Sequence, residues 1–226
     1  MPAPWKLSPS DLTFLWDECR LCFYLKVTGR LDRPRQPFPS IFTRIDGLMK
    51  SYFSDRSTMD FSPTLPPGRV AYSGKSVQSK LIEFKGTPAR SFISGKFDTV
   101  VAFEDRSFGV VDFKTSEPKP EHINFYGRQL HAYAHALENP EPGKFGLSPV
   151  SRLGLFVVQP TAMSRMENGR LAYSGDVAWM EIPRDEAAFL NFIGEVTSLL
   201  ADPVPPPPGE DCSYCAYRLA SRLSGY

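Results

Sequence analysis

The feature that most constrains the fold is a pair of strand-like runs joined by a short polar link. Residues 97–103 and 108–113 are rich in Val and Phe, and the charged and polar residues 104–107 separate them. Runs of this kind are typical of β-strands, and so short a link favours a hairpin. Asp98 lies near the start of the first run, three residues after a glycine. The sequence therefore predicts two adjacent strands with a carboxylate at one end.

The second strand ends in an acidic and a basic residue, in the order Asp112-Phe113-Lys114. Side chains alternate between the faces of a strand, so Asp112 and Lys114 share one face and Phe113 takes the other. With Asp98, this places two carboxylates and an amine together. Carboxylates hold hard divalent cations, and a lysine can orient water or stabilise charge on a phosphate. The pattern favours metal-assisted phosphodiester hydrolysis, whereas an exposed Asp112–Lys114 ion pair without function would be worth little.

The four cysteines form two Cys-x-x-Cys pairs, Cys19 with Cys22 near the start and Cys212 with Cys215 near the end. In a cytosolic chain, two such pairs indicate a bound metal or cluster before a disulfide. A bound metal would tie the two ends of the chain together.

Composition indicates one domain, residues 1–226, with a sizeable core. The chain has 42% hydrophobic and 23% charged residues and a net charge of +1, so no global basic charge marks a nucleic-acid binder. We expect residues 8–26 to form a helix with the first cysteine pair, residues 40–201 to form the core, and residues 203–226 to hold a proline-rich spacer and the second pair. No apolar run approaches the roughly 20 residues of a membrane span, and residues 1–10 lack a secretory core, so we expect a cytoplasmic protein.

A second helix is expected over residues 40–53, with a buried side made of Phe42, Ile45, Met49, Tyr52 and Phe53. Asp46 falls on that side, where an ionised carboxylate needs a partner. It is interpreted either as a salt-bridged residue or as a third metal ligand. A further helix over residues 121–137 places Gln129 and Tyr133 one turn apart. Tyr133 is interpreted equally as a core aromatic or as part of the site.

In their order and spacing these residues resemble the PD-(D/E)XK nuclease superfamily, and specifically its RecB-like branch. The matching motifs are Gly95-x-x-Asp98, Asp112-x-Lys114 and Gln129-x-x-x-Tyr133. The resemblance implies an α/β (α+β) fold of the restriction-endonuclease type, with a central mixed sheet flanked by helices. It also implies that Gln129 and Tyr133 orient Lys114 or the strand backbone.

The resemblance extends to the cysteines. AddB-type and CRISPR-associated RecB-like nucleases hold an iron–sulfur cluster between one early and three late cysteines. Cys19 and the aromatic residues that follow it resemble their early motif, and Cys212 and Cys215 resemble the first two late ones. Ser221 stands where their last cysteine would be, and Cys22 is extra. The resemblance favours a [4Fe-4S] cluster at the four thiolates, and tetrahedral zinc remains the alternative.

We therefore expect Asp98 and Asp112, with Asp46 and the main-chain carbonyl of Phe113, to hold Mg²⁺ or Mn²⁺. Asp46 replaces the histidine that the RecB-like branch usually carries on this helix. Lys114 would position the attacking water or neutralise the transition state.

The expected activity is that of a metal-dependent DNA nuclease, an exonuclease acting on single strands or duplex ends, with a helicase, a repair protein or a CRISPR protein as a possible partner. Two alternatives stay open. The chain could be an inactive nuclease-fold module that binds nucleic acid or a helicase, or an interaction domain held together by metal.

Overall fold

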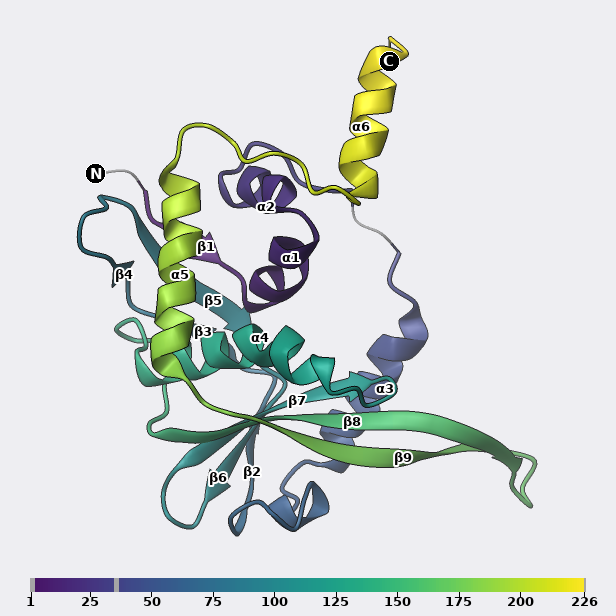
Figure 1. The fold of residues 1–226 in the computed structure, drawn as a ribbon. Helices are drawn as coiled ribbons and strands as arrows, with labels where there is room; N and C mark the ends of the chain where they lie inside the picture. Colours follow the sequence, from purple (N-terminus) through teal and green to yellow (C-terminus); the bar gives the residue numbers. More distant parts are fainter. Residues whose placement is uncertain (1–2, 35–36, 226) are drawn as a thin grey trace.

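The computed structural model describes residues 3–34 and 37–225, and two β-sheets with six α-helices around them make up this part of the chain (Figure 1). The larger sheet has five strands in the order β2-β6-β7-β8-β9. Its strands are β2 (Gly68–Ser73), β6 (Thr99–Phe103), β7 (Phe108–Thr115), β8 (Val150–Arg165) and β9 (Leu171–Ile182). β7 and β8 run parallel and the other neighbours antiparallel. The expected mixed α/β architecture is confirmed.

The smaller sheet has four strands grouped around β5. These are β1 (Trp5–Leu7), β3 (Ser76–Gln78), β4 (Ile82–Glu83) and β5 (Arg90–Lys96). β1 pairs with β5 in parallel, and β3 and β4 pair with it antiparallel. Trp5–Leu7 is thus a sheet strand, an element that the sequence analysis did not predict.

The helices are α1 (Trp16–Glu18), α2 (Arg20–Val27), α3 (Ser40–Tyr52), α4 (Glu121–Glu138), α5 (Glu186–Ala201) and α6 (Ser213–Leu223). Two short turns of other helix types lie at Asp11–Leu15 and Thr58–Asp60. None of the helices within the described ranges combines the length and the apolar character needed to cross a bilayer.

The two faces of the five-stranded sheet bury different cores, and β7 shows how the sequence divides them. Val110 packs into the main core with the helices, whereas Val111 and Phe113 pack into a smaller aromatic core that includes Phe53 and Phe156. Period-two alternation then places Asp112 on the face that α4 covers. The expected opposition of Phe113 to Asp112 is confirmed.

The expected continuous helix over residues 8–26 is wrong, because it is interrupted at Cys19. Cys19 has an extended backbone, with φ −165° and ψ 108°, and α2 begins at the next residue. Cys19 and Cys22 therefore do not lie on one regular helical face. The interruption turns the Cys19 sulfur toward the thiols that arrive from the end of the chain.

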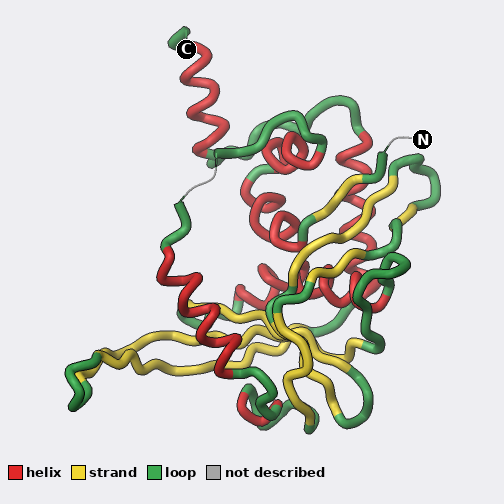
Figure 2. Tube along the Cα trace, turned by 180° about the vertical axis from the view of Figure 1, so that it is seen from behind, coloured by secondary structure: helices red, strands yellow, loops and turns green. Residues whose placement is uncertain are grey.

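The expected buried side of α3 is also largely wrong, since no residue of this helix is fully buried. Phe42 is 41% exposed and Tyr52 is 61% exposed. Only the end of the helix packs firmly, through Met49 and the following Phe53 against the aromatic core. In Figure 2, α3 lies along the outside of the five-stranded sheet, so the rest of its apolar face has no core to enter.

Two features extend from the folded body. β8 and β9 continue beyond the sheet as a two-stranded ribbon that ends at residues 166–170, and α6 stands apart from the other helices (Figure 1). None of the residues of α6 is fully buried. Its attachment therefore depends on the segment that precedes it and on its first residues.

Candidate functional site

Asp98 lies in the short link between β5 and β6, next to β7. Its Oδ2 accepts a hydrogen bond of 3.1 Å from the main-chain N–H of Phe113, the residue after Asp112. Gly95, three residues before it, has to be a glycine: a Cβ there would lie 2.7 Å from a ring carbon of Pro9 and 3.2 Å from the ring of Tyr133. This close packing fixes the end of β5 from which Asp98 projects.

Asp112 is the buried acid of the site, with a relative exposure of 3%. Its Oδ1 accepts a hydrogen bond of 3.2 Å from Nε2 of Gln129 on α4, and its Oδ2 forms an ion pair with Lys114. Burial raises the pKa of Asp112 to about 6, and the neighbouring Asp98 carboxylate adds to this, although the Lys114 charge opposes it. An acid perturbed in this way, with a specific charge partner, is typical of functional sites.

Tyr133 acts on the backbone. Its hydroxyl donates a hydrogen bond of 2.8 Å to the carbonyl of Lys96, the last residue of β5. Burial raises the pKa of Tyr133, so the hydroxyl stays protonated and keeps its donor role. Gln129 therefore holds Asp112, and Tyr133 holds the strand end that leads to Asp98.

Asp46 joins this group through Lys50, a residue that the sequence interpretation missed. The Nζ of Lys50 lies 2.8 Å from Asp46 Oδ2 and 2.7 Å from Asp98 Oδ1. The two carboxylate oxygens are thus no further apart than the sum of these distances. The salt bridge expected for Asp46 is present, and its other interpretation, as a third metal ligand, stays a prediction. The available signal for Lys50 was the spacing of four residues between Asp46 and Lys50 on a helix.

The Lys50 ammonium is strongly held by these acids. Burial alone would lower the pKa of Lys50, but the hydrogen bonds and charges of Asp46 and Asp98 outweigh it and raise the pKa. Three carboxylates are gathered around two ammonium groups, so the cluster retains one net negative charge when all five are ionised. Clustered carboxylate oxygens of this kind suit a hard divalent cation.

The two residues after Asp112 on β7, Phe113 and Lys114, also lie at the site. Lys114 lies beside Asp112, with its Nζ 4.2 Å from the centre of the Tyr126 ring. Phe113 contributes its main-chain N–H to Asp98, and its side chain lies in the aromatic core. The structure thus brings together all seven residues expected at the first site: Asp46, Asp98, Asp112, Phe113, Lys114, Gln129 and Tyr133.

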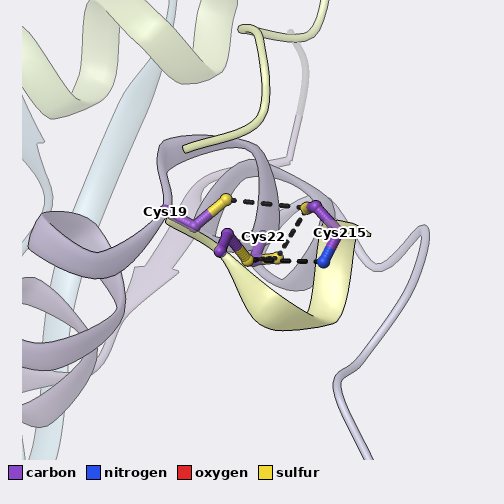
Figure 3. Close-up of side chains that lie close together, drawn as sticks. Cys19, Cys22 and Cys215 are labelled. Carbon is purple, nitrogen blue, oxygen red and sulfur yellow. Dashed lines mark hydrogen bonds between the residues drawn. The ribbon is translucent and has the colours of Figure 1, made fainter. Parts of the chain in front are cut away.

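The four cysteines form a second cluster, between α2 and the start of α6 (Figure 3). All four sulfur atoms lie within 4.8 Å of one another. The Cys19–Cys215, Cys22–Cys212 and Cys22–Cys215 sulfur pairs are 3.7, 3.8 and 3.5 Å apart. No disulfide joins them, so four thiols from the two ends of the chain face one centre.

Hydrogen-bond donors surround the sulfur atoms. The N–H of Gly209 lies 3.3 Å from Cys19 Sγ, and Arg33 Nη2 lies 3.1 Å from Cys212 Sγ. Gly209 allows this approach, because a Cβ there would lie 2.7 Å from the carbonyl oxygen of Glu18. Sequence reasoning did not single out Arg33, which lies eleven residues after Cys22 but far along the chain from Cys212, the thiol that it contacts.

The thiols do not all ionise readily in the absence of a cation. Burial alone would raise the pKa of Cys19, but main-chain N–H groups of Gly209 and Cys22 outweigh it and lower the pKa to about 7. Burial and the neighbouring Cys22 thiol instead raise the pKa of Cys215. Four thiolates this close repel one another, so a bound metal ion or cluster is the condition under which all four are deprotonated.

Comparison with known proteins gives one family. A family model described as the PD-(D/E)XK nuclease superfamily matches residues 61–220, which is more than half of the chain. The match includes the Asp98 and Asp112 site and the second cysteine pair. No curated protein matches the chain. One solved structure, titled "Crystal structure of SSO0001", is similar at 16% identity and a TM-score of 0.47, with 97% of this chain and 86% of that one covered.

Proposed function

Because the chain belongs to the PD-(D/E)XK nuclease superfamily, whose members are typically metal-dependent nucleases, we propose that it cleaves DNA with the help of a divalent cation. The observation that carries the proposal is the convergence of Asp98, Asp112 and Lys114. Asp98 comes from the link before β6 and Asp112 from the neighbouring strand β7, and Asp112 contacts Lys114 directly. An inert surface ion pair would not require a buried acid of raised pKa.

The residues divide into ligands, an amine and supports. Asp98 and Asp112, with Asp46, would hold Mg²⁺ or Mn²⁺, and the carbonyl of Phe113 is a further candidate ligand. A cation bound there supplies polarisation of the scissile phosphate and lowers the pKa of water. Lys114 orients that water and offsets the negative charge that develops on the phosphate.

Gln129 and Tyr133 act as positioning residues. Gln129 fixes the orientation of the Asp112 carboxylate, and Tyr133 fixes the end of β5. The geometry thus favours support of the acids and the strand over direct orientation of Lys114.

The finer proposals follow from the motifs and not from the family match. The order of the three motifs supports the RecB-like branch and an exonuclease acting on single strands or ends. Four free cysteines suit the reducing cytoplasm. A net charge of +1 favours a helicase, a repair protein or a CRISPR protein as a partner that helps to grip DNA.

The test is cleavage of end-labelled single- and double-stranded oligonucleotides with Mg²⁺ or Mn²⁺. We expect Asp112→Asn and Lys114→Ala to abolish cleavage, and Lys119→Ala, which removes an exposed lysine paired with Glu117, to retain it. Full cleavage by the first two variants would refute this site. Salt-sensitive binding without cleavage would instead support the inactive module, and no binding would support the interaction domain.

We propose that the four cysteines hold a single zinc ion, the alternative to the [4Fe-4S] cluster favoured by resemblance. In tetrahedral zinc sites the Zn–S distance is about 2.3 Å, which sets the sulfur atoms about 3.8 Å apart. Three of the sulfur pairs are 3.5–3.8 Å apart. In a four-iron cluster each thiolate binds a different iron, so the sulfur atoms must be further apart.

Elemental analysis of protein purified without air tests this assignment. One zinc per chain and a colourless solution would support it. Stoichiometric iron and sulfide with a visible absorption band would overturn it, and would restore the cluster.

A further inference from the structure

Beside the carboxylate cluster lies a pocket of about 470 Å³ that the catalytic proposal does not use. It is open to solvent, and its lining includes Asp46 and Lys114, so it is continuous with the proposed catalytic centre. Its volume falls within the roughly 300–1,000 Å³ of small-ligand pockets. A ligand held there would lie directly against the group that Lys114 is proposed to stabilise.

The walls of this pocket are aromatic. Phe42 belongs to α3 and Phe38 to the segment before it, and their ring centres are 5.7 Å apart. Phe14 and Tyr126 come from the N-terminal helical turn and α4, with ring centres 5.8 Å apart. Phe38 is 71% exposed, and Phe14 and Phe42 are each more than 40% exposed. Phenylalanine rings clustered on the surface in this way mark a binding site more often than a packing defect.

We propose that this pocket takes one unpaired nucleobase of the substrate strand, stacked on the phenylalanine rings next to the cleavage site. This inference rests on the proposed nuclease function and adds a binding subsite for one base of the substrate strand. Aromatic side chains bind bases of single strands through their flat faces, with little dependence on sequence. In a duplex each base is already stacked and paired, so only a single strand or a frayed end can supply such a base.

The chemistry of the lining favours a nucleobase over an apolar protein segment. Lys114 and Asp46 line the same pocket, as do Thr43 and Thr115, whose side chains carry hydroxyl groups. Hydroxyl groups can hydrogen-bond to the edge of a base while the rings contact its faces. A base held there would leave its adjoining phosphate near Lys114, which is the position that hydrolysis requires.

The test measures binding in the Asp112→Asn background, so that cleavage is not needed. Fluorescence anisotropy would give the affinity for a labelled single strand, for the same strand with abasic positions, and for a duplex whose G·C-rich ends resist fraying. We expect the Phe38→Ala/Phe42→Ala double substitution to weaken single-strand binding about tenfold or more, and to leave duplex binding unchanged. Abasic positions in the single strand should weaken its binding to the Asp112→Asn parent by a similar factor. They should cause no further loss of affinity in the protein that also carries the double substitution.

Tyr217→Ala is the matched control, because Tyr217 on α6 is also 71% exposed and does not line the pocket. It should bind both DNAs as the parent does. Equal losses for single strand and duplex, no loss in the double variant, or additive effects of abasic and protein changes would each overturn the inference. Cleavage is measured separately: stacking without any cleavage in the unaltered chain would refute the nuclease and leave the base pocket standing.

Discussion

Lys50 should compete with the divalent cation that the acids are proposed to bind. Its ammonium lies within 2.8 Å of Asp46 and 2.7 Å of Asp98, which is where a metal ion would neutralise the same oxygens. Lys50→Met removes the charge and keeps a flexible side chain of similar length. We expect the variant to bind Mn²⁺ more tightly than the unaltered chain, and to be less stable without metal because its acids lose a counter-charge.

The size of the effect follows from the charges. Two unit charges about 4 Å apart interact by about 4 kcal/mol at an effective dielectric constant near 20. The Lys50 side chain is 25% exposed and can swing into solvent when metal binds, so only part of that energy opposes the metal. We expect about 1–2 kcal/mol of the Lys50 interaction to oppose metal binding, so its removal should raise the Mn²⁺ affinity roughly tenfold.

Calorimetric titration of Mn²⁺ without DNA measures this affinity directly, and thermal melting at several Mn²⁺ concentrations checks it by linkage. Lys26→Met is the matched control, since Lys26 forms a 2.8 Å ion pair with Asp11 and contacts none of the three site acids by any described ion pair. Its Mn²⁺ affinity should not change. Unchanged or weaker Mn²⁺ binding by Lys50→Met would refute the competition.

Three further predictions concern pH and the thiols. The pKa of Asp112 is raised to about 6, so ionising this carboxyl in the folded chain costs stability as pH rises from about 4 through 6. Between about pH 4.5 and pH 7.5, Asp112→Asn should therefore gain about 1–3 kcal/mol relative to the unaltered metal-free chain. If the denaturant midpoints of both proteins shifted equally over this pH range, the prediction would be contradicted. Burial would raise the pKa of Glu186, but its hydrogen bond and charge interaction with His135 outweigh this and lower it. The stability that Glu186 contributes is therefore present above about pH 4.5 and is lost as pH falls through the lowered pKa of the folded state. Glu186→Gln should cost about 1 kcal/mol at pH 6 in urea unfolding, and a difference that does not shrink as pH falls would argue against the pair. Arg33→Ala removes the hydrogen-bond donor to the Cys212 sulfur. It should weaken zinc binding about 10- to 100-fold, measured by competition with a chelator. A site that holds iron, or an arginine that has no role at the thiols, would not show this effect.

The elements that sequence predicted well are those encoded by local patterns. The turn at residues 104–107 separates β6 and β7 as expected. The alternation of side chains along a strand and a short polar turn sequence can both be recognised from neighbouring residues alone. The long helix α4 also begins and ends within a residue of the expected bounds, since its apolar stripe extends over four turns. Asp112 was placed on the correct face of β7 by the same local alternation.

What sequence could not predict depends on contacts between distant segments. The strand β1 is only three residues long and exists because β5 pairs with it. The interruption at Cys19 reflects thiols nearly two hundred residues away, and helical propensity alone gives no sign of it. Lys50 was overlooked because its role depends on Asp98, which another part of the chain delivers.

The exposed face of α3 was missed for a related reason. A periodic apolar stripe normally predicts burial, and this stripe leaves phenylalanine rings on the surface instead. Periodicity identifies which side chains share a face, but not whether another element covers that face.

A metal joining Cys19 and Cys22 to Cys212 and Cys215 would close most of the polypeptide into a ring. A protease that nicks the protruding tip at residues 166–170 would then yield two fragments that still migrate as one particle. Because β9 pairs with β8 and α5 packs into the main core, a chelator alone should leave the two fragments together and free only α6 and the segment before it. In denaturant, where the sheet and the core no longer hold them, the fragments should stay joined only while the metal is bound, and size measurement with and without chelator shows this.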